Sequence, residues 1–325
     1  MESPWRSLVL NGITLLASTA IALGIAELAV RIAFRDITTA MPAGNYFFNR
    51  WMDREWTGNR WGYRERSFRL EKPIGVRRIA VVGDSLTAGM GVPERKRFTE
   101  LMGRILNAGG DRFEVLNFGA PGAEAHHHLL ALTGQVLATH PDFVLLQWYV
   151  NDFEISKAGS PEPAWHSMAN TGLHRALFRS SAFYFLLDHG WRWLHFELGW
   201  ATPYEQYLSG RFADPAGADS RLAMAQLEGF VSHCARAGVP MGIVLFPLLG
   251  ERWPAYSLAF LHDRVLGMCS RLGIPCLDLT PAYEPFAGQV EKLWVNRFDH
   301  HPSAVAHRLA AERIVSRFAP LFAAP

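Results

Sequence analysis

A serine in a sharp, glycine-rich turn is the first candidate for chemistry in this sequence. Residues 77–91 read RRIAVVGDSLTAGMG, so a short apolar run ends at Gly83 and is followed at once by Asp84 and Ser85. A serine hydroxyl becomes a strong nucleophile when a histidine removes its proton and a carboxylate orients that histidine. Acyl transfer by this chemistry also requires hydrogen-bond donors for an oxyanion. A base, a carboxylate and such donors are therefore expected elsewhere in the chain.

The candidate base and its carboxylate lie near the C-terminus, in the stretch RFDHHPSAVAH. Among the 13 histidines, this cluster alone places a carboxylate beside a histidine ahead of a helical pattern. Asp299 and His301 are two residues apart in an expected loop, so both side chains can point into one pocket with Ser85. Asp84 is expected to hydrogen-bond the turn around Ser85, and Asp152 is expected to have a structural role.

Donors for an oxyanion are available where two other expected strands end. The stretch VLNFGAPG ends in glycines, whose backbone N–H groups can approach a ligand closely. The stretch LLQWYVND ends in Asn151, whose side-chain amide can donate, and the N–H of Ser85 itself is a third candidate. In open parallel sheets ligands bind at the carboxyl ends of the strands, so these groups are expected to converge there.

Other chemistries fit these residues less well. The serine of an α/β-hydrolase lies in G-x-S-x-G, and a P-loop requires G-x-x-x-x-G-K-[ST]; the turn around Ser85 matches neither pattern. Consecutive residues of a helix point in different directions, so His126, His127 and His128 do not form a metal site. We expect neither a metal nor an organic cofactor. A net charge of +2 without a lysine or arginine run predicts no nucleic-acid partner.

Five apolar runs alternate with helical patterns from residue 77 onward. RRIAVVG, FEVLNFG, DFVLLQWYV, VPMGIVLFP and GIPCLDL are bounded by Gly, Pro or Asp and are expected to form buried strands. This alternation predicts a mostly parallel sheet with helices on both faces. For the three cysteines two alternatives stay open: Cys269 and Cys276 pair in an oxidising compartment, or they and Cys234 are small buried side chains.

Residues 155–215 interrupt this alternation with a segment that is rich in aromatic side chains. Asp188, His189 and Arg192 exclude a second membrane span there. Two alternatives stay open for this insertion, a helical segment packed on the core or a lid or acceptor-binding wall over the site.

The N-terminal segment predicts a membrane anchor. Residues 8–30 are almost free of charge until Glu27, and about 20 apolar residues suffice to span a bilayer. Glu27 and Arg31 are four residues apart and can pair on one helix face. A cleaved signal peptide is the alternative, but its basic region would be weak. The expected organisation is an anchor over residues 1–35, a connector over 36–76 and a catalytic domain over 77–325.

Together these motifs resemble the SGNH/GDSL hydrolase superfamily over most of residues 78–320. GDSLTAG is similar to the first block of that family, NFGAPG to the second, VND to the third and DHHP to the last. The resemblance implies Ser85 as the nucleophile, with Gly122 and Asn151 as oxyanion donors. It also implies His301 as the base and Asp299 as the carboxylate that orients it. The family spacing is Asp-x-x-His, which makes His300 an alternative base, and the following Pro302 favours His301.

The resemblance also implies a fold and an activity. The fold is a flavodoxin-like α/β/α sandwich with a five-stranded parallel sheet, to which the N-terminal transmembrane helix is added. The activity is serine carboxylester hydrolysis on a small-molecule or glycan ester; the alternative is O-acyl transfer to cell-envelope polysaccharide. A non-catalytic carbohydrate-binding module is disfavoured, since binding alone needs no base for Ser85. A single-pass anchor in the inner membrane with a periplasmic or extracellular catalytic domain is expected.

Overall fold

The computed structural model describes residues 4–110, 112–154, 172–250 and 256–323. The chain divides into two compact units. The first comprises Met1–Trp51 and Glu162–Ala201, and the second comprises Met52–Pro161 and Thr202–Pro325. Of the aromatic insertion expected over residues 155–215, the part at 155–171 lies outside the described residues.

The second unit is built on a five-stranded parallel sheet. Its strands are β1 (Arg77–Gly83), β2 (Phe113–Gly119), β3 (Phe143–Trp148), β4 (Met241–Leu245) and β5 (Cys276–Asp278), in the order β2-β1-β3-β4-β5. In register, Ile79 lies opposite Val115 on β2 and Phe143 on β3. Because β1 pairs with β2 on one side and β3 on the other, its carboxyl end lies between the carboxyl ends of these two strands. The predicted five-stranded parallel sheet is confirmed.

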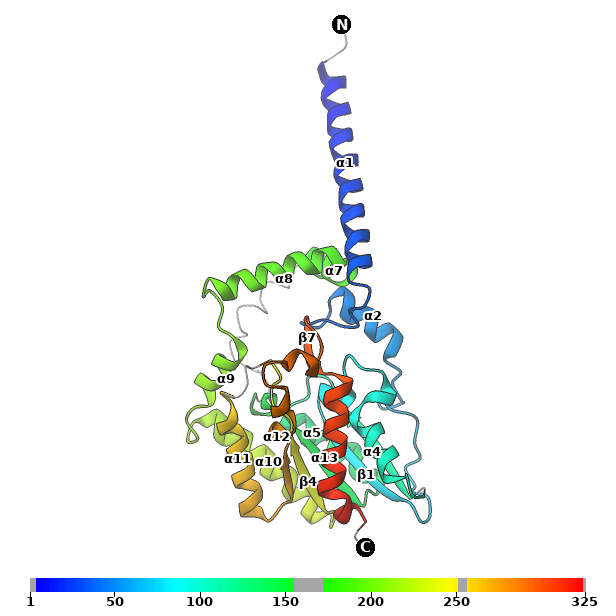
Figure 1. Ribbon diagram of the computed structural model, residues 1–325, viewed down its shortest axis with the longest axis vertical. Coiled ribbons are helices and arrows are strands. Elements are labelled where there is room, and N and C mark those ends of the chain that lie inside the picture. The colour runs from blue at the N-terminus through cyan, green and yellow to red at the C-terminus, as the bar shows by residue number, and fades with distance from the viewer. Residues whose placement is uncertain (1–3, 111, 155–171, 251–255, 324–325) are drawn as a thin grey trace. The chain divides into compact units, whose positions relative to one another are not determined.

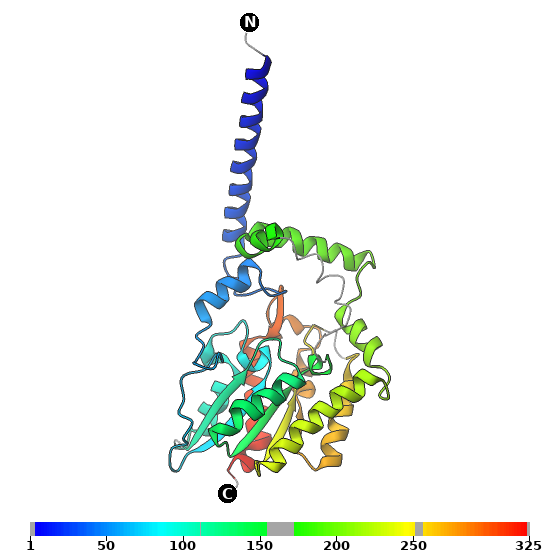
Figure 2. The same ribbon diagram turned by 180° about the vertical axis from the view of Figure 1, so that it is seen from behind.

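Helices cover both faces of this sheet, as Figures 1 and 2 show from opposite sides. Ile79 and Val81 on one face share a buried core with α4 (Phe98–Leu106) and α13 (Ala304–Phe322). The alternate residues Ala80 and Val82 share the other core, which includes α5 (Ala125–Ala131), α10 (Ala218–Arg236) and α11 (Ala259–Leu272). The strands are apolar on both faces for this reason, and the three-layer architecture is that expected from the sequence.

Short elements connect these layers. The helical segments are α3 (Ser85–Ala88), η1 (Glu94–Lys96), η2 (Leu132–Val136), η3 (Leu137–Thr139), η4 (Val150–Phe153), α9 (Tyr204–Phe212), α12 (Thr280–Tyr283), η5 (Glu284–Phe286) and η6 (Val290–Leu293). The segment expected to be a loop around Asp299 forms an antiparallel hairpin instead, between β6 (Trp294–Asn296) and β7 (Asp299–Pro302). Cys269 and Cys276 form a disulfide, and Cys234 is a buried free thiol.

The first unit contains α1 (Pro4–Ala33), most of α2 (Tyr46–Glu55), α7 (Gly172–Ser180) and α8 (Ala182–Glu197). Its buried side chains include Phe47, whose ring lies 5.4 Å from that of Phe185. Within α1, residues Trp5–Ala33 are long and apolar enough to cross a membrane, and the helix is exposed along most of its length. This finding is consistent with the expected single-pass anchor.

Candidate active site

Ser85 lies at the carboxyl end of β1, where the chain turns from this strand into α3. Asp84 caps α3, because its Oδ1 accepts a hydrogen bond from the Leu86 N–H at 2.8 Å. Gly83 is required by close packing: a Cβ at this position would overlap the side chains of Thr87 and Gln147. The role expected for Asp84, to hydrogen-bond the turn, is confirmed by this geometry.

The structure brings Ser85, His301 and Asp299 into one hydrogen-bonded chain. His301 Nε2 lies 2.8 Å from Ser85 Oγ, and His301 Nδ1 lies 2.5 Å from Asp299 Oδ1. Asp299 Oδ1 also accepts the backbone N–H of His301 at 3.0 Å, which fixes the two residues in the hairpin β6–β7. The alternative base, His300, is exposed, and its ring stacks on Trp294 at a centroid distance of 3.9 Å.

The carboxylate of Asp299 makes the imidazole of His301 more basic. Burial disfavours a charged imidazole, but the charge and hydrogen bond of Asp299 outweigh burial, so the pKa of His301 is raised above its ordinary value. Burial alone would raise the pKa of Asp299, yet the charge and hydrogen bonds of His301 lower it. Asp299 therefore stays ionised and holds the Nδ1 proton, which leaves Nε2 free to accept the proton of Ser85.

Asn151 and Gly122 lie on the loops that follow the two strands beside β1. Asn151 is in η4, after β3, and its side-chain Nδ2 donates to the backbone oxygen of Ala123 at 3.0 Å. That contact holds the amide against the loop after β2, which carries Gly122. Gly122 is exposed and has a φ of 74°, a left-handed conformation that favours glycine. Ser85, Gly122 and Asn151 thus follow three adjacent strands at the same sheet edge.

Two buried ionisable residues close to Asp84 form a pair that the sequence pattern did not indicate. His128 Nε2 lies 2.9 Å from Asp152 Oδ1, and both side chains are almost fully buried. Burial lowers the pKa of His128, but the adjacent Asp152 carboxylate more than compensates and raises it. The other oxygen of Asp152 accepts the backbone N–H of Tyr149 at 3.0 Å, so Asp152 is structural, as expected. No spacing rule links positions so far apart in sequence.

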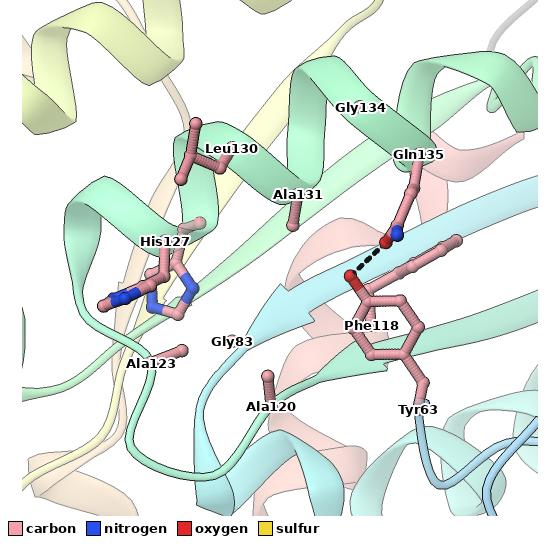
Figure 3. Close-up of a pocket in the computed structure, with 11 residues that line it drawn as sticks. Tyr63, Gly83, Phe118, Ala120, Ala123, His127, Leu130, Ala131, Gly134 and Gln135 are labelled. Carbon is pink, nitrogen blue, oxygen red and sulfur yellow. Dashed lines mark hydrogen bonds between the residues drawn. The ribbon is translucent and has the colours of Figure 1, made fainter. Parts of the chain in front are cut away.

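A cavity of about 330 Å³ lies beside this sheet edge (Figure 3). Small side chains leave its space open, among them Ala120 and Ala123 from the loop after β2 and Ala131 from α5. On one side the hydroxyl of Tyr63 donates to Gln135 Oε1 at 2.5 Å. The remaining lining residues are Gly83, Phe118, His127, His128, Leu130 and Gly134.

Acidic side chains gather at one other place among the described residues. Carboxylate oxygens of Glu65, Glu94 and Glu100 lie within 4.8 Å of one another. The guanidinium of Arg97 pairs with all three, at 3.0, 3.4 and 3.1 Å respectively. A positive charge is therefore already present in this cluster.

Comparisons with known proteins identify one matching family. The sequence model of the GDSL-like Lipase/Acylhydrolase family matches residues 81–309. A search of curated proteins found no match. Among solved structures, the lipase/acylhydrolase from Enterococcus faecalis is similar, with 18% identity, a TM-score of 0.46 and coverage of 76% of this chain and 97% of the other. A catalytic mutant of the acetylxylan esterase Axe2 from Geobacillus stearothermophilus is also similar, with 14% identity, a TM-score of 0.46 and coverage of 75% and 95%.

Proposed function

Since the chain belongs to the GDSL-like lipase/acylhydrolase family and is thus an ester hydrolase, we propose that it works through an acyl-enzyme on Ser85. One observation carries this proposal: the continuous hydrogen-bonded chain from Ser85 Oγ through the imidazole of His301 to the buried carboxylate of Asp299. This arrangement pairs a nucleophile with a base, and the base with a group that orients it. In it, Ser85 is the nucleophile, His301 the general base and Asp299 the orienting carboxylate.

Acylation follows from these positions. As Ser85 Oγ attacks the ester carbonyl carbon, its proton passes to His301 Nε2 and the carbonyl electrons move onto the oxygen. The N–H groups of Ser85 and Gly122 and the side-chain amide of Asn151 donate to that oxyanion. The tetrahedral intermediate then collapses, the bond to the alcohol oxygen breaks, and His301 returns its proton to the leaving alcohol.

Deacylation repeats the same proton transfers with water as the nucleophile. His301 Nε2 takes a proton from water, the hydroxide attacks the acyl carbon, and the same donors stabilise the second oxyanion. When this intermediate collapses, Ser85 Oγ leaves and regains its proton from His301, and a carboxylic acid is released.

In this proposal α1 anchors the chain in the inner membrane. The catalytic residues then lie on the periplasmic or extracellular side. The disulfide between Cys269 and Cys276 supports this side, because disulfides persist in oxidising compartments. A fusion of alkaline phosphatase after residue 40 tests the placement. We expect phosphatase activity, and an inactive fusion protein at normal abundance would place the second unit on the cytoplasmic side.

Matched alanine variants of adjacent histidines test the catalytic assignment. The full chain in detergent micelles is assayed on p-nitrophenyl acetate, butyrate and decanoate. His301→Ala is expected to lose about 10³-fold or more in kcat, whereas His300→Ala should stay within a few-fold of the wild type. The reverse order would assign the base to His300. The chain-length profile ranks acyl groups, and turnover only on addition of a sugar would indicate acyl transfer to a glycan hydroxyl.

A further inference from the structure

Two helices of the first unit are joined at a single carboxylate, that of Glu27 in α1. Glu27 accepts a hydrogen bond from Ser181 Oγ at 2.7 Å and from the backbone N–H groups of the first two residues of α8, at 3.0 and 2.9 Å. The first N–H groups of a helix have no partner within the helix, and a negative charge is favourable there. The adjacent Arg31 donates to the Ser180 backbone oxygen at 3.0 Å, at the end of α7. The start of α8 is thus fixed to one position along α1.

That position corresponds to a membrane boundary. Trp5 and Glu27 are separated along the helix by about 33 Å, at ~1.5 Å per residue. The hydrocarbon core of a bilayer is about 30 Å thick. If Trp5 lies at one boundary of the hydrocarbon core, Glu27 lies at the other. The first residues of α8 are then at the level of the lipid headgroups.

From this point α8 runs crosswise to α1, in both views of the first unit (Figures 1 and 2). A helix that crosses the bilayer lies roughly along its normal. A helix that starts at the boundary and runs crosswise to the first therefore lies along the membrane surface. Both helices belong to the same compact unit, and Glu27 joins them directly.

Leucine and tryptophan form an apolar stripe along one side of α8. Leu187, Trp191 and Leu194, together with the C-cap residue Leu198, follow the spacing i, i+4, i+7, i+11, which places them on one helix face. They are 54%, 46%, 38% and 49% exposed, respectively. Phe185 lies about 200° from Leu187 around the helix, at 100° per residue. The stripe therefore faces away from the side on which Phe185 packs.

The buried side of α8 shows how the stripe is oriented. Phe185 is fully buried, and its ring packs against Phe47 of α2 and Phe178 of α7. Toward this packed side, Asp188 and Arg192 pair at 2.6 Å, and their side chains are only 10% and 15% exposed. Tryptophan is enriched at membrane–water interfaces, and helices with one apolar face bind there in the plane of the membrane.

We propose that α8 lies in the lipid–water interface of the membrane that α1 crosses, with its apolar stripe against lipid acyl chains. This proposal rests on the membrane anchor described under the proposed function. The occupant is bilayer lipid, because α8 starts where the lipid-exposed surface of α1 ends and is fixed there at headgroup depth. The aromatic segment would then serve as a second membrane contact that fixes the rotation of the first unit on the bilayer.

Two tryptophans of α8 form a matched pair that tests the orientation. Trp191 is in the stripe, and Trp193, which is 58% exposed, lies about 200° from it around the helix. Trp191→Cys and Trp193→Cys variants of the full chain are labelled with a maleimide NBD dye without reductant, so that the disulfide and the buried Cys234 do not react. Each is reconstituted into vesicles of phosphatidylcholine and phosphatidylglycerol, and Leu16→Cys reports on α1.

The probe at residue 191 is expected to be quenched by lipids that carry a nitroxide near the headgroup. It should also be several-fold less accessible to aqueous iodide than the probe at residue 193. Equal iodide quenching at both positions would overturn the proposal. Protection of residue 191 from both iodide and nitroxide lipid would also overturn it, since protein rather than lipid would then cover the stripe.

The probe at residue 16 separates this inference from the anchor. Strong quenching there by lipids with a nitroxide deep in the acyl chain shows that α1 is inserted. A failure at residue 191 then counts against α8 alone. No quenching at residue 16 would refute the anchor and the position of α8 with it. Hydrolysis of p-nitrophenyl acetate by each labelled protein verifies that it is folded.

Discussion

Replacing Asp84 with asparagine is expected to stabilise the protein at neutral pH. The Asp84 side chain is 1% exposed, and its Oδ2 accepts no hydrogen bond from the residues that the structure describes. Burial, together with the nearby carboxylate of Asp152, raises the pKa of Asp84 from 3.8 to about 6. Asparagine keeps an oxygen that can accept the Leu86 N–H but carries no charge. The substitution therefore removes the buried charge and preserves the cap of α3.

The size of the effect follows from the raised pKa of Asp84. One pKa unit corresponds to about 1.4 kcal/mol, so a rise from 3.8 to about 6 corresponds to about 3 kcal/mol when the carboxylate is ionised. The pKa of Asp84 is higher in the folded state than in the unfolded state. Asp84 therefore costs no stability below pH 3.8, and the cost reaches its full size as the pH rises through about 6. The gain in Asp84→Asn should be about 3 kcal/mol near pH 7.5 and about 1 kcal/mol near pH 4.5.

Urea unfolding of the full chain in detergent micelles, followed by tryptophan fluorescence at both pH values, measures this gain. Asp53→Asn is the matched control, because the same chemical change at an exposed position should alter the free energy of unfolding by less than about 0.5 kcal/mol. A gain of equal size at the two pH values would show that ionisation of Asp84 is not its cause. Lower stability of Asp84→Asn at both pH values would refute the reasoning outright.

Three further substitutions test the site. Asp299→Asn removes the charge that raises the pKa of His301, so kcat should fall about 10⁴-fold and the acid limb of kcat/KM should move to lower pH. In the wild type that limb should lie above pH 6.5, because His301 is active only when neutral. Asn151→Ala should lower kcat about 10²–10³-fold with little change in KM. Gly119→Ala should destabilise the fold by more than about 2 kcal/mol, since its Cβ would overlap the backbone of Ala88.

Each of these predictions has a measurement that can contradict it. An acid limb at the same pH in Asp299→Asn would mean that Asp299 does not set the pKa of His301. Wild-type kcat in Asn151→Ala would remove this amide from the oxyanion site. For Gly119→Ala the control is Gly210→Ala in α9, where nothing lies within 4 Å of a Cβ; helix propensity predicts a gain of about 0.5–1 kcal/mol there. Similar stability changes at the two positions would contradict the packing argument.

The sheet was predictable because its signal is local. Each strand is a short apolar run that ends at glycine, proline or a polar residue, and burial on both faces makes the run continuous. The turn around Ser85 was predictable for the same reason, and the pairing of Asp299 with His301 followed from their proximity in sequence. The structure places all three in hydrogen-bond contact. Their roles in catalysis are still predictions.

The contacts that were missed join residues far apart in the chain. His128 and Asp152 pair in the interior, and neither position has a neighbour in sequence that marks it as half of a pair. The expected pairing of Glu27 with Arg31 is present at 2.6 Å, but nothing in the sequence indicated that Glu27 also caps α8. Such pairs are determined by packing of elements that are separate in sequence, and local periodicity does not record them.

The connector gave a further example. Residues 36–76 were expected to form a connector, yet Glu65 in this segment is buried and lies 3.0 Å from the guanidinium of Arg97. Burial, only partly offset by the charge of Arg97, raises the pKa of Glu65 to about 7. The sequence of a short polar segment does not show which residues, distant in sequence, its side chains contact.

The most direct test of the account is to locate the acyl group during turnover. The full chain in detergent micelles is mixed with p-nitrophenyl acetate, quenched in acid within the first turnover, digested and analysed by mass spectrometry. We expect one acetyl group in the wild type, on Ser85. In His301→Ala this acetyl group accumulates further only if the substitution slows deacylation more than acylation. Ser85→Ala should carry none and should lack hydrolysis above the micelle blank. Hydrolysis that persists in Ser85→Ala, or an acetyl group on another residue of a fully active enzyme, would contradict the assignment of Ser85 as the nucleophile.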